Sequence, residues 1–183
     1  MVYYAAQVRT GKENEVGNLI GRRVDPALAG AFVPTRVLSI RKGGTTKKEE
    51  RPVFPGYVFI SSPDETLPAD AYWIIKRVDG FGRFLPSNID RKPLFGRDLE
   101  LLSHFISFGR RADISKVSFD ENDRIVVLEG PLKGLEGSII RVDRRKGRVK
   151  VRLAMCADSF AVDLGAEFVE RLPRGSDDQH GHA

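Results

Sequence analysis

The chain has 183 residues, of which 41% are hydrophobic and 30% charged, and its formal net charge is +5. This is the composition of a globular protein with its own core, and no apolar run reaches the roughly 18 residues of a membrane-spanning helix. The start of the chain lacks a signal-peptide pattern, and the single cysteine, Cys156, cannot form an internal disulfide. We therefore expect a cytoplasmic, monomeric protein with no membrane partner.

The first 107 residues alternate between strand and helix patterns. Residues 2–9 predict a strand, Thr10 and Glu13 have the spacing of a capping box, and an apolar helical face follows at Val16, Leu19, Ile20 and Val24. Further strands are expected over 31–40, 52–61, 72–78 and 81–86, and helices over 64–71 and 96–107. Because short turns join several of the strands, we expect residues 1–107 to form one α+β sandwich domain with a mostly antiparallel sheet.

The rest of the chain is strand-like. Residues 108–117 have no clear period and predict a flexible linker. Turn signals then separate five short apolar runs at 123–129, 136–143, 147–154, 158–164 and 167–172. Five short strands in so few residues predict a small five-stranded β-barrel over 118–172, followed by a disordered tail at 173–183.

The sequence offers no catalytic or metal-binding set. His180 and His182 lie in the predicted tail, His104 lies on a predicted helix, and Cys156 has no histidine near it in sequence. The glycines between 130 and 137 lack the Gly-Lys-Ser/Thr ending of a phosphate-binding loop. We therefore expect neither an enzyme nor a cofactor or metal site.

Two basic clusters are candidates for contact with nucleic acid. The first surrounds a predicted hairpin tip and, against Glu49 and Glu50, consists of Arg36, Arg41, Lys42, Lys47, Lys48 and Arg51. The second lies between residues 141 and 152. Lysine and arginine side chains that project from a hairpin can reach phosphates, but a solvated loop tip and a solvated barrel face explain the same patterns.

An aromatic pair gives a sharper signal. Phe54 and Tyr57 enclose a Pro-Gly step, and strict strand alternation would send the two rings to opposite faces. A bend at Pro55-Gly56 would instead let both rings line one groove, and aromatic rings in a groove are typical anchors for a protein partner.

Two stretches of the chain resemble the NusG family of transcription factors. Residues 52–58, Pro-Val-Phe-Pro-Gly-Tyr-Val, resemble the signature of the family's N-terminal (NGN) domain, and residues 123–137 resemble its KOW motif. The KOW resemblance depends on Gly130, Lys133, Gly134 and Gly137. Residues 3–7 resemble the family's opening strand, with Tyr3 where tryptophan is usual.

The resemblance implies a mechanism. In the family, the NGN domain binds the clamp helices of the largest catalytic subunit of RNA polymerase and suppresses pausing and termination. By match, Phe54, Pro55 and Tyr57 would bind these helices, with Tyr3 and Leu102 as further candidates. The KOW barrel would bind Rho, a ribosomal protein or RNA.

Three departures from the family pattern point to a specialised paralog. Arg77-Val78 stand where pause-reading members carry Asn-Thr, so contact of Arg77 with DNA phosphates is expected in place of base reading. The KOW partner loop reads Met155, Cys156, Ala157 and Asp158 and lacks the usual phenylalanine. The loop at 41–51 is unusually basic. Together these resemble RfaH or LoaP antiterminators, with non-template DNA or a nascent RNA hairpin as the nucleic-acid partner.

Two alternatives remain open at the level of sequence. One is the general housekeeping NusG factor, which couples polymerase to Rho or to the ribosome. The other is a KOW-containing RNA-binding protein of the ribosome, although the stretch from Phe54 to Tyr57 argues against it.

Overall fold

A computed structural model describes residues 1–170 of the protein. A four-stranded sheet organises its N-terminal half. Its strands lie in the order β2-β5-β1-β6 and all pair antiparallel. Their bounds are β1 (Val2–Val8), β2 (Gly30–Phe32), β5 (Tyr57–Ser62) and β6 (Phe81–Phe84). The predicted tail at 173–183 lies outside the described residues.

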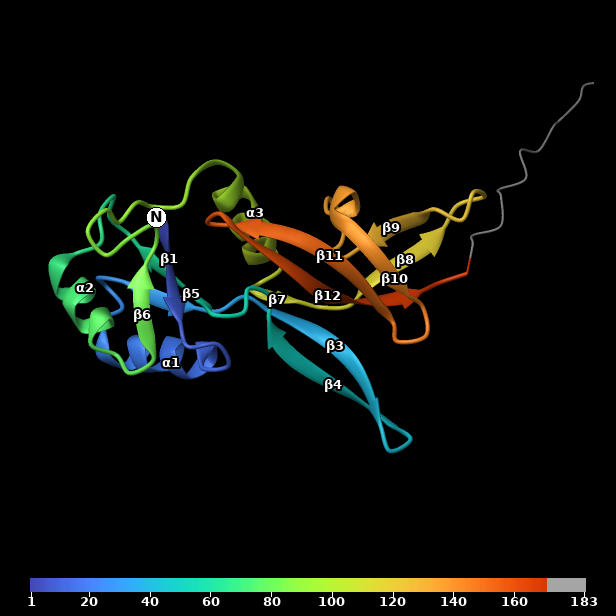
Figure 1. The fold of residues 1–183 in the computed structure, drawn as a ribbon, viewed down its shortest axis with the longest axis horizontal. Coiled ribbons are helices and arrows are strands. Elements are labelled where there is room, and N and C mark those ends of the chain that lie inside the picture. The colour runs from blue at the N-terminus through green and yellow to red at the C-terminus, as the bar shows by residue number, and fades with distance from the viewer. Residues whose placement is uncertain (171–183) are drawn as a thin grey trace, which may run out of the picture.

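The two faces of this sheet are covered differently. Helices α1 (Glu13–Arg23) and α2 (Ala69–Lys76) bury one face, where Tyr4, Ile20 and Ile60 belong to one apolar cluster. Helix α3 (Gly96–Ser107) contributes Leu102 and Phe105 to a second cluster on the other face. That second cluster continues without a break into the C-terminal half. Figure 1 shows α3 beside the strands of that half.

A long hairpin projects from the N-terminal half (Figure 1). It consists of β3 (Thr35–Lys42) and β4 (Thr45–Pro52), and the short strand β7 (Arg111–Ala112) pairs parallel with the start of β3. Gly43 and Gly44 form the tip with φ of 59° and 79°, which is the left-handed pair that a two-residue hairpin turn requires.

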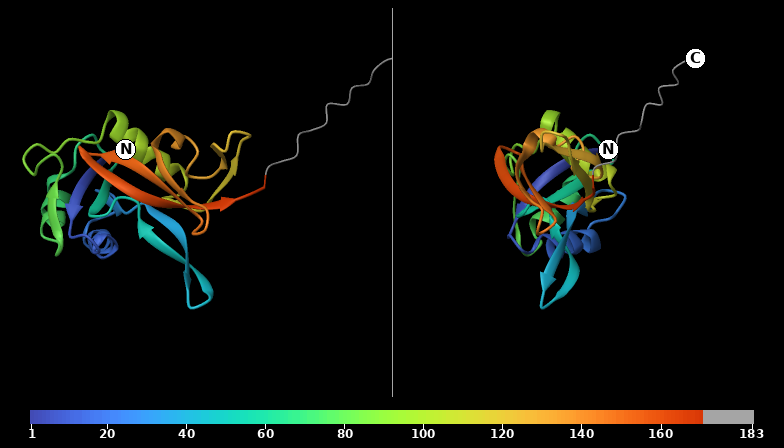
Figure 2. Two further views of the ribbon diagram at one scale, coloured as in Figure 1. Left: turned by 45° about the vertical axis from the view of Figure 1, so that its right-hand side comes forward. Right: turned by 90° about the vertical axis from the view of Figure 1, so that its right-hand side faces the viewer.

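The C-terminal half is a five-stranded curled sheet with the order β10-β11-β12-β8-β9. Its elements are β8 (Ser115–Phe119), β9 (Ile125–Glu129), the 3-10 turn Glu136–Ser138, β10 (Ile139–Asp143), β11 (Arg148–Met155) and β12 (Asp158–Phe168). Along β11, buried Val149, Val151 and Leu153 alternate with outward-facing polar residues. Figure 2 shows how these strands curl around one another. The predicted α+β class with a small C-terminal β-barrel is thus confirmed.

Several sequence predictions about individual elements are wrong. Residues 72–78, predicted as a strand, lie mostly in helix α2, where Trp73 is exposed and Tyr72 and Ile75 are buried. Apolar runs this short fit a strand and a helix equally well. Residues 158–164 and 167–172 were predicted as two strands, but 158–164, Gly165 and 167–168 fall in the single strand β12, and residues 171–172 lie outside the described residues. The fifth strand of the curled sheet is instead β8.

The predicted linker at 108–117 contains ordered strand structure. Strand β7 and the first residues of β8 fall within it, and both pair with neighbouring strands. Such short strands leave no hydrophobic period in the sequence, because their order comes from partners distant along the chain. The domain boundaries at 107 and 118 stay predictions.

The capping box is also wrong. The N-cap of α1 is Lys12 and carries no side-chain capping bond. The Glu13 carboxylate instead accepts a hydrogen bond from the Gly56 N–H at 2.6 Å, across 43 residues of chain.

Candidate protein interface and basic surfaces

The Pro-Gly step between Phe54 and Tyr57 bends the chain as the aromatic pattern suggested. The Tyr57 N–H donates to the Phe54 carbonyl at 3.2 Å, and Gly56 has φ of 82°. Proline followed by a residue with positive φ makes a type II turn. The turn is fixed from outside by Glu13 and by the Val8 N–H, which donates to the Gly56 carbonyl at 2.8 Å. Both rings consequently belong to the same apolar cluster.

The surface that this turn creates is covered. Phe54 is 1% exposed and Tyr57 3% exposed. Phe160 of β12 makes edge-to-face contacts with both rings, at centroid distances of 5.8 Å to Phe54 and 5.2 Å to Tyr57. Phe54 also meets Phe105 of α3 edge-to-face at 5.7 Å. Phe160 is therefore the aromatic residue through which the C-terminal half closes the groove.

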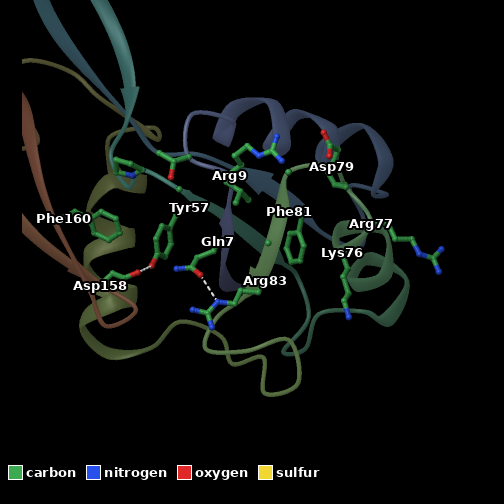
Figure 3. Close-up of a pocket in the computed structure, with 17 residues that line it drawn as sticks. Gln7, Arg9, Tyr57, Lys76, Arg77, Asp79, Phe81, Arg83, Asp158 and Phe160 are labelled. Carbon is green, nitrogen blue, oxygen red and sulfur yellow. Dashed lines mark hydrogen bonds between the residues drawn. The ribbon is translucent and has the colours of Figure 1, made fainter.

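A hydrogen bond also joins the two halves beside these aromatic rings. The Tyr57 hydroxyl donates to the carboxylate of Asp158, as Figure 3 shows beside Phe160. Burial raises the pKa of Tyr57 well above its usual value, and the hydrogen bond donated to Asp158 raises that pKa further. The phenol is thus held in its protonated, donating form.

The predicted KOW partner loop forms the other side of the contact. It is a tight turn between β11 and β12 in which Cys156 and Ala157 have positive φ, 52° and 67°. The Cys156 N–H donates to the Asp98 carboxylate of α3 at 3.1 Å, and Met155 is fully buried. Burial raises the pKa of the Cys156 thiol to about 12, and the nearby Asp98 and Asp158 charges act in the same direction.

Further contacts extend along the seam between the two halves. The His104 Nε2 of α3 lies 2.7 Å from the Pro131 carbonyl. Gly165 of β12 lies so close to β3 that a Cβ there would be 2.5 Å from the Val37 carbonyl oxygen. A glycine inside a strand marks a close approach of another backbone.

The structure therefore brings together two sets of residues that the sequence assigned to different partners. Phe54 and Leu102 pack on one side, and Met155, Cys156 and Asp158 lie on the other. Pro55 is half-buried at the turn and lines the neighbouring cleft. Tyr3 lies farther along the same cluster and meets Phe32 edge-to-face at 5.9 Å. Sequence reasoning missed Phe160, since a phenylalanine in a strand pattern carries no sign of an outward role.

The basic residues of the hairpin are exposed and lie on both of its faces. Lys47 lies opposite Ile40, whereas Lys48 lies opposite Ser39, so consecutive lysines point to opposite sides. Arg51 is paired with Glu49 at 2.7 Å. The residues of the candidate set on this hairpin are Arg41, Lys42, Lys47, Lys48 and Arg51.

Arg77 lies elsewhere, at the C-terminal end of α2. It borders a cleft between α2, β6 and the Pro-Gly turn, with three further cations, Arg9, Lys76 and Arg83. Figure 3 shows Arg83 beside Gln7, with which it makes a hydrogen bond at 2.8 Å, and Lys76 and Arg77 extending from α2. No local pattern in the sequence groups these cations, because it is the pairing of β1 with β6 that brings them together.

The KOW glycines have structural roles. Gly130 has φ of 98° and lies where a Cβ would be 2.7 Å from the Ser115 Cα. Gly134 has φ of 88°, Lys133 is exposed, and Gly137 lies in the 3-10 turn. These residues shape the loop between β9 and β10.

Two general findings concern the part of the chain that the structure describes. None of its helices is long and apolar enough to cross a membrane. Within residues 1–170, no group of three or more His, Cys, Asp or Glu side chains is arranged to hold a metal ion.

Comparison with known proteins gives consistent matches. Residues 1–102 match the family described as "Transcription termination factor nusG", and residues 121–152 match the KOW motif. A protein of Synechocystis sp. named "Transcription termination/antitermination protein NusG" is 28% identical, over 92% of this chain and 88% of its own length. A protein of the same name from Thermus thermophilus is 24% identical, over 88% of this chain and 94% of its own.

A solved structure shares the fold. It is described as "Domain interaction in Thermotoga maritima NusG" and superposes with a TM-score of 0.51 at 19% identity, covering 90% of this chain and 93% of that one.

Proposed function

Because the chain belongs to the NusG family, we propose that it is a transcription elongation factor that binds the clamp helices of RNA polymerase through Phe54, Pro55 and Tyr57. The observation that carries the proposal is the aromatic groove at the type II turn, where two rings and the apolar face of α3 converge. Large rings gathered in one groove are the usual centre of a protein interface.

In the arrangement that the structure shows, in which the two halves are docked and which we call the closed form, this groove is already filled. Phe160 occupies the place between the two rings, and Tyr57 is hydrogen-bonded to Asp158. A helix of another protein and the turn between β11 and β12 cannot use the same apolar surface together. We infer that polymerase binds an open form, in which the C-terminal half has moved away, and that the apparent affinity falls in proportion to the closed fraction.

The same opening also exposes the binding surface of the C-terminal half. Cys156 and Asp158 of the KOW partner loop contact α3 and Tyr57 in the closed form. Opening on polymerase therefore frees this loop for a second partner, a ribosomal protein or Rho. Because closing masks both binding surfaces, the second partner would meet mainly those molecules that are already bound to polymerase.

The exposed cations supply contact with nucleic acid. The hairpin carries Lys42, Lys47 and Lys48 away from the aromatic groove, whereas Arg77 shares with Arg9 and Arg83 a cleft that Tyr57 and Phe160 also line. This arrangement suits a protein that binds polymerase by apolar burial and nearby DNA or RNA by phosphate contact. It supports a processive antitermination role.

The names of the relatives favour a second candidate, the general NusG factor that acts in termination as well as antitermination. The two candidates differ in their effect on Rho-dependent termination. A general factor stimulates Rho-dependent termination in a purified transcription assay, whereas an antiterminator suppresses it and reduces pausing.

The polymerase proposal is tested with a change that opens the molecule and leaves the groove intact. Phe160→Ala removes both edge-to-face contacts and alters neither Phe54 nor Tyr57. If it costs the closed form about 2 kcal/mol, binding to an isolated clamp-helix fragment should tighten up to about 30-fold. Tyr57→Ala should instead weaken binding of the opened protein by about 2 kcal/mol or more.

Phe168→Ala is the matched control. Phe168 belongs to the same strand and stacks on Phe119 at 5.8 Å, away from the groove. It should disturb the curled sheet without tightening clamp-helix binding. Equal affinities of the wild type and Phe160→Ala, together with no loss in Tyr57→Ala, would place the polymerase contact on another surface.

A further inference from the structure

A second cluster at the seam between the two halves has no place in the polymerase proposal. Arg36 of β3 lies close enough to Arg148 of β11 and Asp163 of β12 for their charges to act on it. The Arg148 Nη2 donates to the Ser39 carbonyl of β3 at 3.5 Å, so this side chain reaches across the seam. Its Nη1 lies 3.8 Å from an Asp163 oxygen, and the Lys150 Nζ lies 3.8 Å from the other. One carboxylate therefore faces three cations, at long range.

The guanidinium groups of this cluster are short of acceptors. Arg36 is only 8% exposed, and its Nε and Nη1 are buried, as is the Nε of Arg148. Within residues 1–170, no atom accepts a hydrogen bond from any of these three donors. A buried guanidinium with unused donors is costly, because arginine cannot shed its charge to reduce the cost. Burial, together with the neighbouring Arg51 and Arg148 charges, lowers the pKa of Arg36 to about 10, against the attraction of Asp163.

A small cavity of about 90 Å³ adjoins the cluster. Its lining has four cations and two carboxylates: Arg141, Asp143, Lys146, Arg148, Lys150 and Asp163. Asp143 already accepts a hydrogen bond from the Lys146 N–H at 3.0 Å. A volume equal to about three water molecules suits one small ion and is too small for a stretch of polymer.

From this geometry we propose that the seam binds one small tetrahedral oxyanion of the phosphate class, held by Arg148 and Lys150 and attracted by the nearby charge of Arg36. A phosphate offers several acceptor oxygens, and the planar fork of arginine matches two of them at once. The unused Nε donor of Arg148 is the group that such an ion satisfies, because Arg148 lines the cavity. Asp163 and Asp143 repel an anion, so the ion competes with Asp163 for Lys150.

The ion binds the closed molecule preferentially. Arg36 comes from the N-terminal half, whereas Arg148 and Lys150 come from the C-terminal half. An anion that is attracted by cations of both halves stabilises their docking by its difference in affinity for the closed and open forms. Phosphate should therefore oppose opening, whether or not the molecule opens for polymerase.

The experiment uses the full chain and inorganic phosphate. Calorimetric titration at constant ionic strength, with chloride as the balancing anion, should give saturable binding near one site per chain. Arg148→Gln should weaken that binding at least about 10-fold, since it removes a charged donor pair. Arg36→Gln should weaken the binding by a smaller factor, because Arg36 acts through its charge and does not line the cavity. Arg148→Gln keeps the test valid if the more buried Arg36 variant fails to fold.

Arg152→Gln is the matched control. It removes one positive charge from the same outward face of β11, and Arg152 does not line the cavity. Its phosphate affinity should stay within about 2-fold of the wild type. Absence of saturable phosphate binding, or equal loss in Arg152→Gln and Arg148→Gln, would overturn the proposal.

A parallel titration separates free phosphate from nucleic-acid phosphate. Oligothymidylate should not compete with inorganic phosphate for the seam, and Arg148→Gln should leave its affinity within about 2-fold. If only the oligonucleotide binds, and Arg148→Gln weakens it, the site takes a polymer backbone and its assignment to a free ion is wrong.

Discussion

Glu13 positions a turn that lies 43 residues away in the sequence. Its carboxylate is 3% exposed and accepts the Gly56 N–H at 2.6 Å. Removing a buried acceptor leaves a donor without a partner, which typically costs about 1–3 kcal/mol. We therefore expect Glu13→Ala to lower the free energy of unfolding by about 2 kcal/mol in a denaturant titration.

Glu15→Ala is the control for this change. Glu15 belongs to the same helical turn, but it is exposed and pairs only with Lys12 at the surface. Surface ion pairs contribute about 0–1 kcal/mol, so this variant should be nearly neutral. Equal effects of the two substitutions would mean that Glu13 does not hold the turn.

Cys156 makes the closed form measurable, because it is the only cysteine of the chain. Burial and the neighbouring carboxylates raise the pKa of its thiol to about 12, so very little reactive thiolate exists near pH 8. Phe160→Ala should restore an ordinary thiol, and alkylation should accelerate by about two orders of magnitude. The rate is followed by mass spectrometry of the intact protein.

Phe168→Ala again serves as the comparison, since it keeps the contacts of Phe160. Its alkylation rate should stay close to that of the wild type. A wild-type rate equal to that of an unstructured cysteine peptide would show that the thiol is not protected.

At the scale of elements, the approach of β12 to β3 depends on Gly165. A Cβ at this position would lie 2.5 Å from the Val37 carbonyl oxygen and 3.0 Å from Ile114. Because backbone cannot yield as a side chain does, Gly165→Ala should push the two strands apart and favour the open form. Small-angle scattering should then report a larger radius of gyration.

Gly137→Ala is the matched glycine control, because a Cβ there meets nothing within 4 Å. This variant should keep the compact dimensions of the wild type. A compact Gly165→Ala protein would mean that the seam adjusts locally and that this glycine does not control docking.

The hairpin β3–β4 gives a second prediction at this scale. Lys47 and Lys48 project from opposite faces, so a single strand that follows one face meets only one of them. Replacing both by alanine should flatten the slope of log K against log salt for single-stranded DNA by about 0.7, the value for one contact. A flattening of the slope by about 1.4 would indicate a strand wrapped around the tip. An unchanged slope would indicate that the hairpin is only solvated.

The elements also show which features the sequence could predict. Helix α3 was predicted over its full length, because Leu102 and Phe105 repeat at helical spacing within a long segment. The bend between Phe54 and Tyr57 followed from the conformational limits of proline and glycine. The sequence does not predict helix α2, because a short apolar run fits a strand as well as a helix. It does not predict strand β12 as one strand, because a glycine can either end a strand or lie inside it. Only tertiary contacts decide in each case.

At the scale of the whole molecule, the relation between the two halves lay beyond sequence reasoning. The residues of the polymerase groove and those of the KOW loop were each found from a local motif, but nothing local indicates that they face one another. Phe54 and Phe160 are 106 positions apart by their numbers, and their contact depends on how a curled sheet docks on α3. The docking was therefore visible only in three dimensions.

The titrating groups at this docked surface give the molecule a pH dependence. Tyr57 and Cys156 both have a raised pKa in the closed form, Tyr57 through burial and its bond to Asp158, and Cys156 through burial and the Asp98 and Asp158 charges. Their ordinary values are 10.0 and 9.0. Above these values the open form loses protons that the closed form retains, so each pH unit shifts the balance toward opening by at most about tenfold per group.

We therefore expect docking to be fully stable below about pH 9 and to weaken steadily above it, with Cys156 titrating first and Tyr57 about one unit later. Small-angle scattering across pH 7 to 11 should show expansion before loss of the far-ultraviolet circular dichroism signal. Cys156→Ser removes the first titrating group, keeps the turn and the Tyr57–Asp158 bond, and should delay the onset of expansion by about one pH unit. Expansion that begins at the same pH in both proteins would assign the alkaline opening to other groups, whereas a molecule that stays compact until it unfolds would show that its halves do not separate.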